Sequence, residues 1–503
     1  MERGEYRALP GTEGAHSPFF SPDGRWIGFF AHDKLKKVSI SGDQPITLCD
    51  ATLGFGGSWA SDGVIYFSTD YSSGISRVPE TGGAPKSVTG EGWQLAPSMF
   101  PQVLPGNRGI LFSIQTFVLG VYDLRNHEGS VILSGGTFPR YAPTGHIVFA
   151  LRGAVQVAPF DAQQFRVTGP AVQLFDGVRT ERDGAGQFTF SESGTFIYAS
   201  GRDGAVGSLV AIDRSGNKRA LQAIPGDYSA FSISPDGSHV AIPVNTQMGT
   251  DIWLYDMARG TTTRVTSDNH SSFPVWSADG NAIYYASRPA GVSNLYRKSI
   301  TGGESVQLTH WQSFWASPLA VTRDGRSLLI DKFNPDTKAD LWILHLAEDG
   351  RSVDETPFLA SSFSEYLADL SPNGRWAAYT SDESGGWEVY VSSFPHPGEK
   401  IRISTNGGEE PRWSPNGREL YYRFGTKWFV VDVSASDQFT ASRPRLLFEG
   451  PFANVPGYSW VVTPDGNHFL VVEGVDQTTT LRELNVVTNV FDEIKRRTSP
   501  MGR

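Results

Sequence analysis

The sequence predicts an all-β fold, and three observations support this expectation. A unit of about ten residues recurs along the 503-residue chain, in which an apolar stretch is followed by a Pro-Asp-Gly-like turn and a second apolar stretch. The chain contains 55 Gly and 31 Pro, while aromatic residues make up 12 %, which indicates many tight turns between short strands. The apolar residues lack the 3.6-residue periodicity of helices. Together these observations predict two tandem β-propellers of four-stranded blades.

One glycine marks each copy of the unit. The markers recur at intervals of roughly 40–50 residues, which is the length of a four-stranded propeller blade. Glycine adopts a positive φ at no steric cost, whereas a residue with a Cβ atom loses ~1 kcal/mol or more there. We therefore interpret the neighbouring aspartates as turn scaffold rather than as acid–base groups. The marker glycines are Gly24, Gly63, Gly106, Gly145, Gly194, Gly237, Gly280, Gly325, Gly374, Gly417 and Gly466.

The strands of a blade can be assigned in order along the chain. A short apolar strand such as 273–276 precedes the turn, and a second apolar strand such as 282–285 follows it. A third strand, such as 251–256, comes next, and a polar fourth strand, such as 262–266, ends the blade. The fourth strand is polar because the outer edge of a blade faces water.

Eleven blades exceed the four to eight of a typical single ring, so the chain should form two rings. We predict a first propeller over residues 1–212 with five to six blades, and a second over residues 213–497 with six blades. Residues 498–503 are expected to be a disordered tail. The closing strand of the first ring is expected from residues 1–10 or from elsewhere in the chain.

Composition excludes several classes of function. The net charge is −10 and no basic face is evident, so nucleic acid is an unsuitable partner. No stretch reaches the ~18–20 apolar residues of a membrane span, so direct membrane insertion is not expected. The single cysteine excludes a disulfide within the chain.

No catalytic motif occurs in the sequence. Gly-x-Ser-x-Gly, kinase catalytic loops and phosphate-binding loops followed by a helix are all missing, as are His-x-His and His-Glu-x-x-His pairs. We therefore predict no catalytic residue, no metal ligand and no cofactor. One alternative stays open, a lyase or hydrolase acting on a sugar or lactone at the central channel, because such enzymes draw one group from each blade.

The repeat also predicts a candidate binding site in the second ring. Counting eight residues back from each marker glycine leads to the start of the first strand, which in a propeller lies near the channel mouth. These residues and their neighbours are polar, aromatic and acidic, which suits a peptide, a sugar or a cationic group. The predicted set is Ser229, Ser272, Ser317, Tyr366, Glu409 and Tyr458, with His270, Trp315 and Glu410 beside them.

The repeat resembles the WD40-like PD40 blade of the TolB family, in which Ser-Pro-Asp-Gly is followed by a later Leu-Thr, here Leu308-Thr309 and, varied, Val265-Thr266. Longer stretches resemble the C-terminal propeller region of bacterial eukaryotic-like serine/threonine protein kinases. They are GTEGAHSPFFSPDGRWIGFF from Gly11, DIWLYDMARGTTTRVT from Asp251, ESGGWEVYVSSFP from Glu383, GGEEPRWSPNGRELYYR from Gly407 and LNVVTNVFDEIKRR from Leu484.

This resemblance implies a non-catalytic sensor or interaction module that binds a protein, peptide or small molecule at a propeller face. It also implies a kinase domain as a partner in the full-length protein. A periplasmic or extracytoplasmic location follows if the chain derives from a membrane kinase, and a cytoplasmic one otherwise.

Overall fold

The computed structural model describes most of the chain. The described residues are 8–51, 54–69, 74–89, 98–114, 118–151, 153–181, 184–201, 207–221, 228, 230–246, 249–289, 292–311, 315–334, 338–435, 438–453, 457–474 and 484–499.

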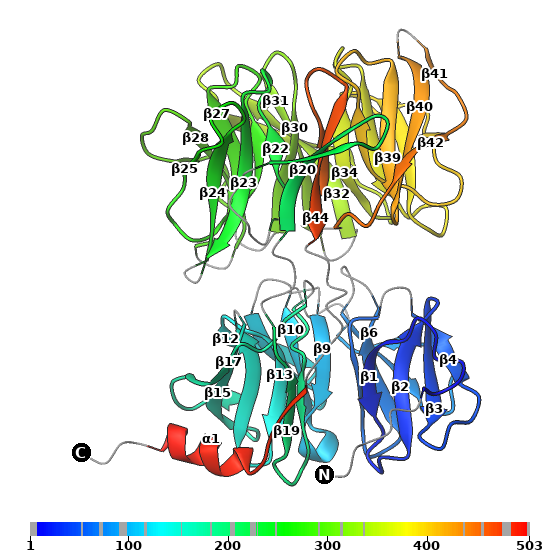
Figure 1. Ribbon diagram of the computed structural model, residues 1–503, viewed down its shortest axis with the longest axis vertical. Coiled ribbons are helices and arrows are strands. Elements are labelled where there is room, and N and C mark those ends of the chain that lie inside the picture. Colours follow the sequence, from blue (N-terminus) through cyan, green and yellow to red (C-terminus); the bar gives the residue numbers. More distant parts are fainter. Residues whose placement is uncertain are drawn as a thin grey trace. The chain divides into compact units, whose positions relative to one another are not determined.

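The fold is all-β, as predicted. Within the described ranges the strands form eleven separate antiparallel sheets, and most of them are four-stranded meanders in which each strand pairs with the next along the chain (Figure 1). Two compact units contain these sheets. Unit 1 comprises residues 1–204 and 479–503, and unit 2 comprises residues 205–478.

Unit 1 contains five of the sheets, with strand orders β1-β2-β3-β4, β5-β6-β7-β8, β12-β11-β10-β9, β13-β14-β15-β16 with β17 also on β15, and β18-β19-β45. A 3₁₀ turn, Pro105–Asn107, joins β9 to β10. The strands are β1 (His16–Phe20), β2 (Trp26–Ala31), β3 (Lys34–Ser39), β4 (Ile46–Asp50), β5 (Gly57–Trp59), β6 (Val64–Ser68), β7 (Ile75–Pro79), β8 (Lys86–Ser87), β9 (Ser98–Val103), β10 (Gly109–Ile114), β11 (Val118–Asp123), β12 (Glu128–Ser134), β13 (Thr137–Ala142), β14 (His146–Leu151), β15 (Ala154–Asp161), β16 (Arg166–Val167), β17 (Val172–Asp176), β18 (Phe188–Phe190), β19 (Phe196–Ala199) and β45 (Leu484–Val487).

Unit 2 contains six sheets. Five follow chain order, β22-β23-β24-β25, β26-β27-β28-β29, β30-β31-β32-β33, β34-β35-β36-β37 and β38-β39-β40-β41 with β42 also on β40; the sixth has the order β21-β20-β44-β43. The strands are β20 (Gly207–Asp213), β21 (Lys218–Ala220), β22 (Ser232–Ile233), β23 (His239–Thr246), β24 (Gly249–Asp256), β25 (Thr262–Arg264), β26 (Ser271–Trp276), β27 (Ala282–Ser287), β28 (Asn294–Ser299), β29 (Val306–Gln307), β30 (Trp315–Val321), β31 (Ser327–Asn334), β32 (Lys338–Leu346), β33 (Ser352–Leu359), β34 (Glu365–Leu370), β35 (Trp376–Ser381), β36 (Glu388–Ser393), β37 (Ile401–Arg402), β38 (Glu409–Trp413), β39 (Glu419–Phe424), β40 (Lys427–Ala435), β41 (Phe439–Ala441), β42 (Arg445–Glu449), β43 (Trp460–Val462) and β44 (His468–Gly474).

The marker glycines confirm the predicted turns. Every one of the eleven lies between the first and second strands of a sheet and has a positive φ, as in Gly24 (68°) and Gly194 (85°). The turn aspartates are scaffold, as expected. In one copy the Ser277 hydroxyl donates to Asp279 at 2.5 Å and accepts the Ala282 N–H at 2.9 Å. The same Ser-to-Asp bond measures 2.6 Å in the turns of Ser21 and Ser234. These bonds fix the turn, which explains why the motif recurs.

Apolar clusters join each sheet of unit 2 to the next. Leu254 of one sheet packs with Tyr285 of the following sheet, and equivalent clusters connect every consecutive pair. The sheet that contains β43 and β44 also packs against the β22–β25 sheet, through Val461, Leu470 and Val240. The six sheets of unit 2 are therefore linked in an unbroken series of core contacts.

In each unit, one sheet pairs strands that are distant in sequence. In unit 2, β20 pairs with β44 along their full length, and the two strands lie side by side in Figure 1. In unit 1, β45 pairs with β19 through Phe196–Val487 and Ala199–Leu484.

These pairings explain why the units differ from the predicted boundaries of 1–212 and 213–497. Because β20 completes a sheet of unit 2, that unit begins at residue 205, and because β45 completes a sheet of unit 1, residues 479–503 group with unit 1. Residues 500–503 of the predicted tail lie outside the described residues.

The C-terminal helix α1 (Val490–Thr498) docks onto unit 1. Its Val490 and Ile494 side chains are buried in a cluster with Val148 and Val157, and the Thr498 hydroxyl contacts His146 Nε2 at 2.8 Å. Thr498 is the last residue of this helix, and the Ser499 N–H caps it by donating to the Lys495 carbonyl. Across the described part of the chain, no helix has the length and apolar character that crossing a membrane requires.

Candidate functional site

The candidate site lies on the first strands of the unit 2 sheets. We use "first strands" for β22, β26, β30, β34, β38 and β43, and each of these from β22 to β38 contacts the first strand of the following sheet. Several of these strands contain a β-bulge, where the register with the second strand shifts. The bulge holds Phe273, Leu367 and Glu410 at φ values of 53°, 48° and 54°. A bulge of this kind redirects the neighbouring side chains, so the repeat presents paired residues at each strand start.

Most of the predicted site residues lie at these strand starts. Ser272, Ser317, Tyr366, Glu409 and Glu410 belong to β26, β30, β34 and β38, and Tyr458 lies two residues before β43. Trp315 begins β30 and packs edge-to-face on Phe273, with ring centroids 5.7 Å apart. His270 is exposed beside β26. Ser229 lies outside the described residues.

Glu410 is part of a buried network rather than an open ligand. Its carboxylate is 1 % exposed and accepts hydrogen bonds from the Ser459 N–H at 2.7 Å and the Ser459 hydroxyl at 2.8 Å. The guanidinium of Arg423, itself 4 % exposed, lies 3.6 Å away. Burial raises the pKa of Glu410, and Arg423 opposes this shift. These contacts join β38 to the sheet of β43 and serve the fold.

Tyr458 is also held within the protein. Its hydroxyl donates to the Pro411 carbonyl at 3.1 Å, and the Arg412 guanidinium lies 3.3 Å from the centre of its ring. Arg412 in turn forms an ion pair with Asp369 at 3.6 Å. Asp369 accepts the Trp413 N–H at 2.8 Å, so three neighbouring first strands share one polar network.

Glu409 and Tyr366 differ from these residues because their polar ends are unoccupied. Among the described residues, neither the Glu409 carboxylate nor the Tyr366 hydroxyl has a hydrogen-bond or ion-pair partner. Burial, followed by the charge of Glu410, raises the pKa of Glu409 to about 7, and Arg423 opposes the shift. The Tyr366 ring is fixed edge-to-face on Trp387 at 4.9 Å.

Four residues of the cluster were not predicted: Asp331, Asp369, Arg412 and Arg423. Asp331 comes from a second strand, β31, and its carboxylate accepts the Ser317 N–H at 2.8 Å and the Ser317 hydroxyl at 2.6 Å. Burial raises the pKa of Asp331 to about 6. Asp369 and Arg412 each stand five residues before a marker glycine, so counting five as well as eight residues back finds them.

The site is a compact, acid-rich cluster. Burial raises the pKa of Tyr458 and of Tyr366 well above the usual tyrosine value, and the nearby charges of Glu409 and Glu410 raise the pKa of Tyr366 further. The cluster combines four carboxyl groups with two guanidinium groups, and within the described residues Glu409 is the only one of these acids without a hydrogen-bond or ion-pair partner. In the described residues, no group of three or more His, Cys, Asp or Glu is arranged to hold a metal ion. The arrangement can attract and hydrogen-bond a cation.

Comparison with known proteins identifies the repeats. Residues 195–416 match the family model described as the TolB beta propeller domain. An uncharacterized protein of Agrobacterium fabrum is 24 % identical over 296 residues, which is 56 % of this chain and 94 % of that protein. The Tol-Pal system protein TolB of Francisella tularensis is 27 % identical over 162 residues, which is 31 % of this chain and 35 % of TolB.

Two solved structures are also similar to this chain. A putative TolB from Agrobacterium tumefaciens is 18 % identical with a TM-score of 0.44, and covers 53 % of this chain and 98 % of its own. TolB from Acinetobacter baumannii is 13 % identical with a TM-score of 0.38, and covers 74 % of this chain and 79 % of its own. The family match covers residues 195–416, so that part of the chain carries TolB-like PD40 β-propeller repeats, as the sequence predicts. The kinase-associated part of the resemblance stays a prediction.

Proposed function

We propose that the chain is a non-catalytic binding module of two tandem β-propellers, and that the first strands of unit 2 bind a cationic group of a peptide or protein. The unbroken series of core contacts between the six sheets of unit 2 supports a closed ring with the first strands at its centre. A ring of this kind gathers residues from separate sheets into one site, which is where propellers bind ligands.

The single observation that carries the proposal is the unpartnered carboxylate of Glu409. A half-buried acid beside a second acid is unfavourable in the free protein, so an incoming cation gains more from it than from a solvated carboxylate. Tyr366 adds a hydroxyl next to this charge, and its ring is already fixed by Trp387. A lysine or arginine side chain matches both groups, through an ion pair to Glu409 and a hydrogen bond to Tyr366.

The comparisons favour a protein or peptide as the source of the cation. The curated relatives from Francisella tularensis are by name components of the Tol-Pal system, and this chain covers only 35 % of their length. A protein ligand for this chain is therefore part of our proposal, carried over from similarity of the repeats. Protein surfaces also supply lysine and arginine in an extended, accessible form.

The role as a sensor attached to a kinase is a separate part of the proposal. It rests on the resemblance of the segments from Gly11, Glu383 and Gly407 to kinase-associated propellers. The coding sequence around this chain tests it, because an in-frame kinase domain and a membrane helix would support the role. A complete reading frame without either would remove this part and leave the binding site unaffected.

The binding site is tested by titrating the protein with tetralysine and with tetraglutamine at pH 8, where Glu409 is ionised. We expect saturable binding of tetralysine only, weakened about tenfold or more by Glu409→Gln and less by Tyr366→Phe. Glu304→Gln, which changes an exposed glutamate of the same unit, is the matched control and should bind as the wild type. Glu410 is not a suitable test residue, because its carboxylate holds Ser459 and Arg423 inside the protein.

Circular dichroism spectra and the urea midpoint keep this test interpretable. The spectrum of Glu409→Gln should match that of the wild type, and its urea midpoint at pH 8 should be equal or higher, since the ionised Glu409 carboxylate makes no internal bond and is disfavoured by burial. Equal affinity of wild type and a folded Glu409→Gln variant for tetralysine would contradict the proposed site.

A further inference from the structure

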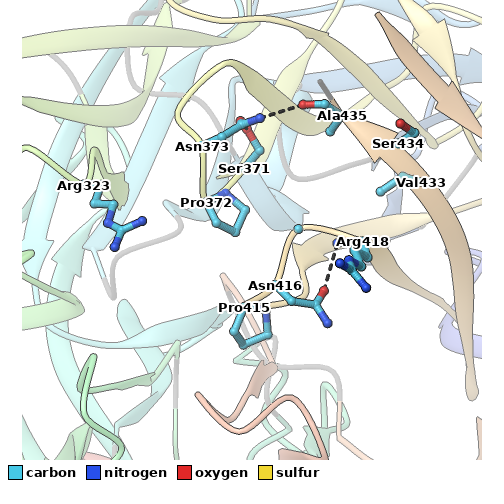
Figure 2. Close-up of a pocket in the computed structure, with 11 residues that line it drawn as sticks. Arg323, Ser371, Pro372, Asn373, Pro415, Asn416, Arg418, Val433, Ser434 and Ala435 are labelled. Carbon is cyan, nitrogen blue, oxygen red and sulfur yellow. Dashed lines mark hydrogen bonds between the residues drawn. The ribbon is translucent and has the colours of Figure 1, made fainter. Parts of the chain in front are cut away.

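A second candidate site lies at the opposite end of the same first strands. A pocket of about 640 Å³ opens beside the turns that join β34 to β35 and β38 to β39. Figure 2 shows Arg323 and Arg418 on either side of these turns, with Pro372 and Pro415 between them. Val433, Ser434 and Ala435 of β40 complete the wall. Glu409 and this pocket stand at opposite ends of β38, so the two sites are separate.

The two arginines have no acidic partner. Arg323 and Arg418 are exposed, and within the described residues neither guanidinium forms a hydrogen bond or an ion pair. The lining residues include no aspartate or glutamate. Asp324, next to Arg323 in sequence, instead accepts the Thr322 hydroxyl at 2.6 Å and the Arg326 N–H at 3.0 Å.

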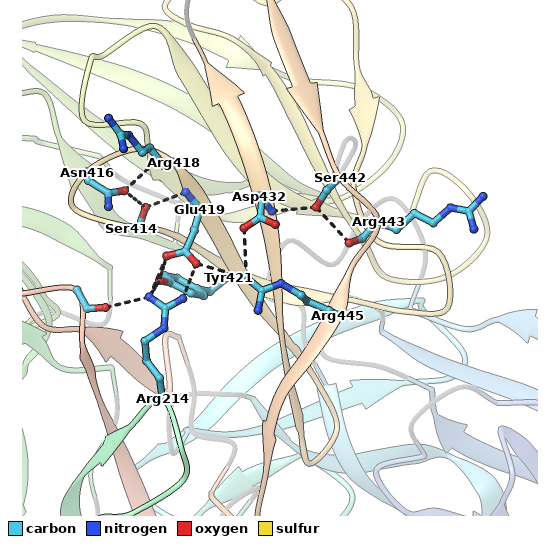
Figure 3. Close-up of polar contacts among 11 residues, drawn as sticks. Arg214, Ser414, Asn416, Arg418, Glu419, Tyr421, Asp432, Ser442, Arg443 and Arg445 are labelled. Atoms are coloured by element: carbon cyan, nitrogen blue, oxygen red, sulfur yellow. Dashed lines mark hydrogen bonds and ion pairs between the residues drawn. The ribbon is translucent and has the colours of Figure 1, made fainter.

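The acid nearest to Arg418 in sequence is neutralised by another residue. Glu419 accepts hydrogen bonds from Arg214 and from the Tyr421 hydroxyl, the latter at 2.7 Å, and Arg445 lies 3.6 Å away (Figure 3). Arg214 comes from the turn between β20 and β21, so this contact also helps close unit 2. The charge of Arg418 is therefore uncompensated.

The internal repeat provides a second, independent observation. The first turn of each unit 2 sheet carries an aspartate in four copies, Asp236, Asp279, Asp324 and Asp465, but an asparagine in the two that line the pocket. Asn416 performs the scaffold task of the aspartate, accepting the Ser414 hydroxyl at 2.8 Å and the Arg418 N–H at 2.9 Å. Asn373 does the same through Ser371 and Arg375. The Asn373 amide also donates to the Ala435 carbonyl at 2.6 Å, a bond that aspartate could not make. The Asn416 turn shows no such bond in the described residues, so the effect of asparagine there is to keep a negative charge out of this pocket.

We propose that this pocket binds an oligoanion, a ligand with two or more carboxylate or phosphate groups. Arginine presents several N–H donors in a fork that matches both oxyanions, and two such residues favour a ligand with at least two charges. The volume is larger than one oxyanion requires and falls within the range of small-ligand sites. The Asn416 amide, whose Nδ2 has no hydrogen-bond partner among the described residues, adds a neutral donor between the arginines.

The test uses two probes, citrate for clustered carboxylates and tripolyphosphate for clustered phosphates, titrated calorimetrically into the full chain at low ionic strength. We expect saturable binding of at least one probe, and the better probe identifies the chemistry of the anionic group. The double variant Arg323→Gln/Arg418→Gln should bind the better probe tenfold or more weakly. Raising the salt concentration should also weaken binding to the wild type.

Asn416→Asp is the sharper variant. Aspartate occupies the same turn position in other sheets, so the fold should be retained while a negative charge enters the pocket. We expect about three- to tenfold weaker binding. Arg259→Gln, which lowers the net charge of unit 2 by the same one unit but lies elsewhere, should have no effect. Failure of both probes to bind, or equal affinity of wild type and Asn416→Asp, would overturn the proposal.

Discussion

Arg140 in unit 1 and Arg412 in unit 2 occupy the same position of the repeat, five residues before Gly145 and Gly417, yet their surroundings differ. Arg412 pairs with Asp369 and covers the Tyr458 ring. Arg140 lies 3.7 Å from the centre of the Phe138 ring and donates to the Phe100 and Pro139 carbonyls. In the described residues Arg140 has no carboxylate partner, and burial lowers its pKa to about 9.

The residues around the two arginines also differ between the units. Unit 1 gathers Phe55, Met99 and Phe100 into an apolar cluster with Phe138 beside it, whereas unit 2 gathers acids. Phe138 and Glu410 stand seven residues before their markers and have the same φ of 54°. The backbone of the repeat therefore accepts either an apolar or an acidic residue at this position. The side chains on the first strands, rather than the fold, distinguish the two units.

The largest expected effect on stability comes from replacing each of the two matched bulge residues, Glu410 and Phe138, by leucine. Glu410→Leu leaves the Arg423 guanidinium buried without a counter-charge, which should destabilise unit 2 by about 3–5 kcal/mol. Phe138→Leu removes part of an apolar contact and should cost about 1–2 kcal/mol. Urea unfolding followed by tryptophan fluorescence measures both. Equal losses in the two variants would show that the units do not differ as described.

The matched arginines should give a smaller difference. Arg412→Met removes the partner of Asp369, with an expected loss of about 2–3 kcal/mol. Arg140→Met removes a half-buried charge that lacks a carboxylate, so its effect should be below about 1 kcal/mol in either direction. Thermal unfolding of both variants provides the comparison, and a larger loss for Arg140→Met would contradict it.

The pH dependence of stability should also separate the units. Glu409 and Asp331 have pKa values raised by burial to about 7 and about 6, so the folded state holds their protons more tightly than the unfolded chain does. Their contribution therefore falls as the pH rises from about 5 to 7 and levels off above 7. Glu409 should account for about 1–3 kcal/mol of this fall. Unfolding free energies of wild type and Glu409→Gln between pH 5 and 8 test this, and parallel curves would disprove the role of Glu409.

The sequence predicts the repeat well because each turn is locally encoded. In one turn the Ser234 hydroxyl donates to Asp236 and accepts the His239 N–H, and the Gly237 N–H donates to the Ser234 carbonyl, so these bonds join residues at most five positions apart and the eleven turns could be located in advance. The closing strands could not be located, because β20 and β45 pair with β44 and β19 across more than 200 residues and carry no marker of that choice.

The candidate site was predicted in outline only. Counting from the markers located Tyr366 and Glu409 at neighbouring strand starts. This count could not distinguish Glu409 from Glu410. The two glutamates are adjacent in sequence, and only the structure shows that the β-bulge directs the Glu410 carboxylate inward to Ser459. Asp331 was missed because it reaches the cluster from a second strand.

The pH dependence of cation binding tests the central claim most directly. Tetralysine stays charged between pH 5.5 and 8, while Glu409, with its neighbours Glu410 and Arg423, should lose its proton near pH 7. We predict that the affinity measured by calorimetry rises by up to about tenfold per pH unit below 7 and then levels off, and that Glu409→Gln abolishes the rise. Affinity that is independent of pH, or a rise that persists in Glu409→Gln, would contradict the account.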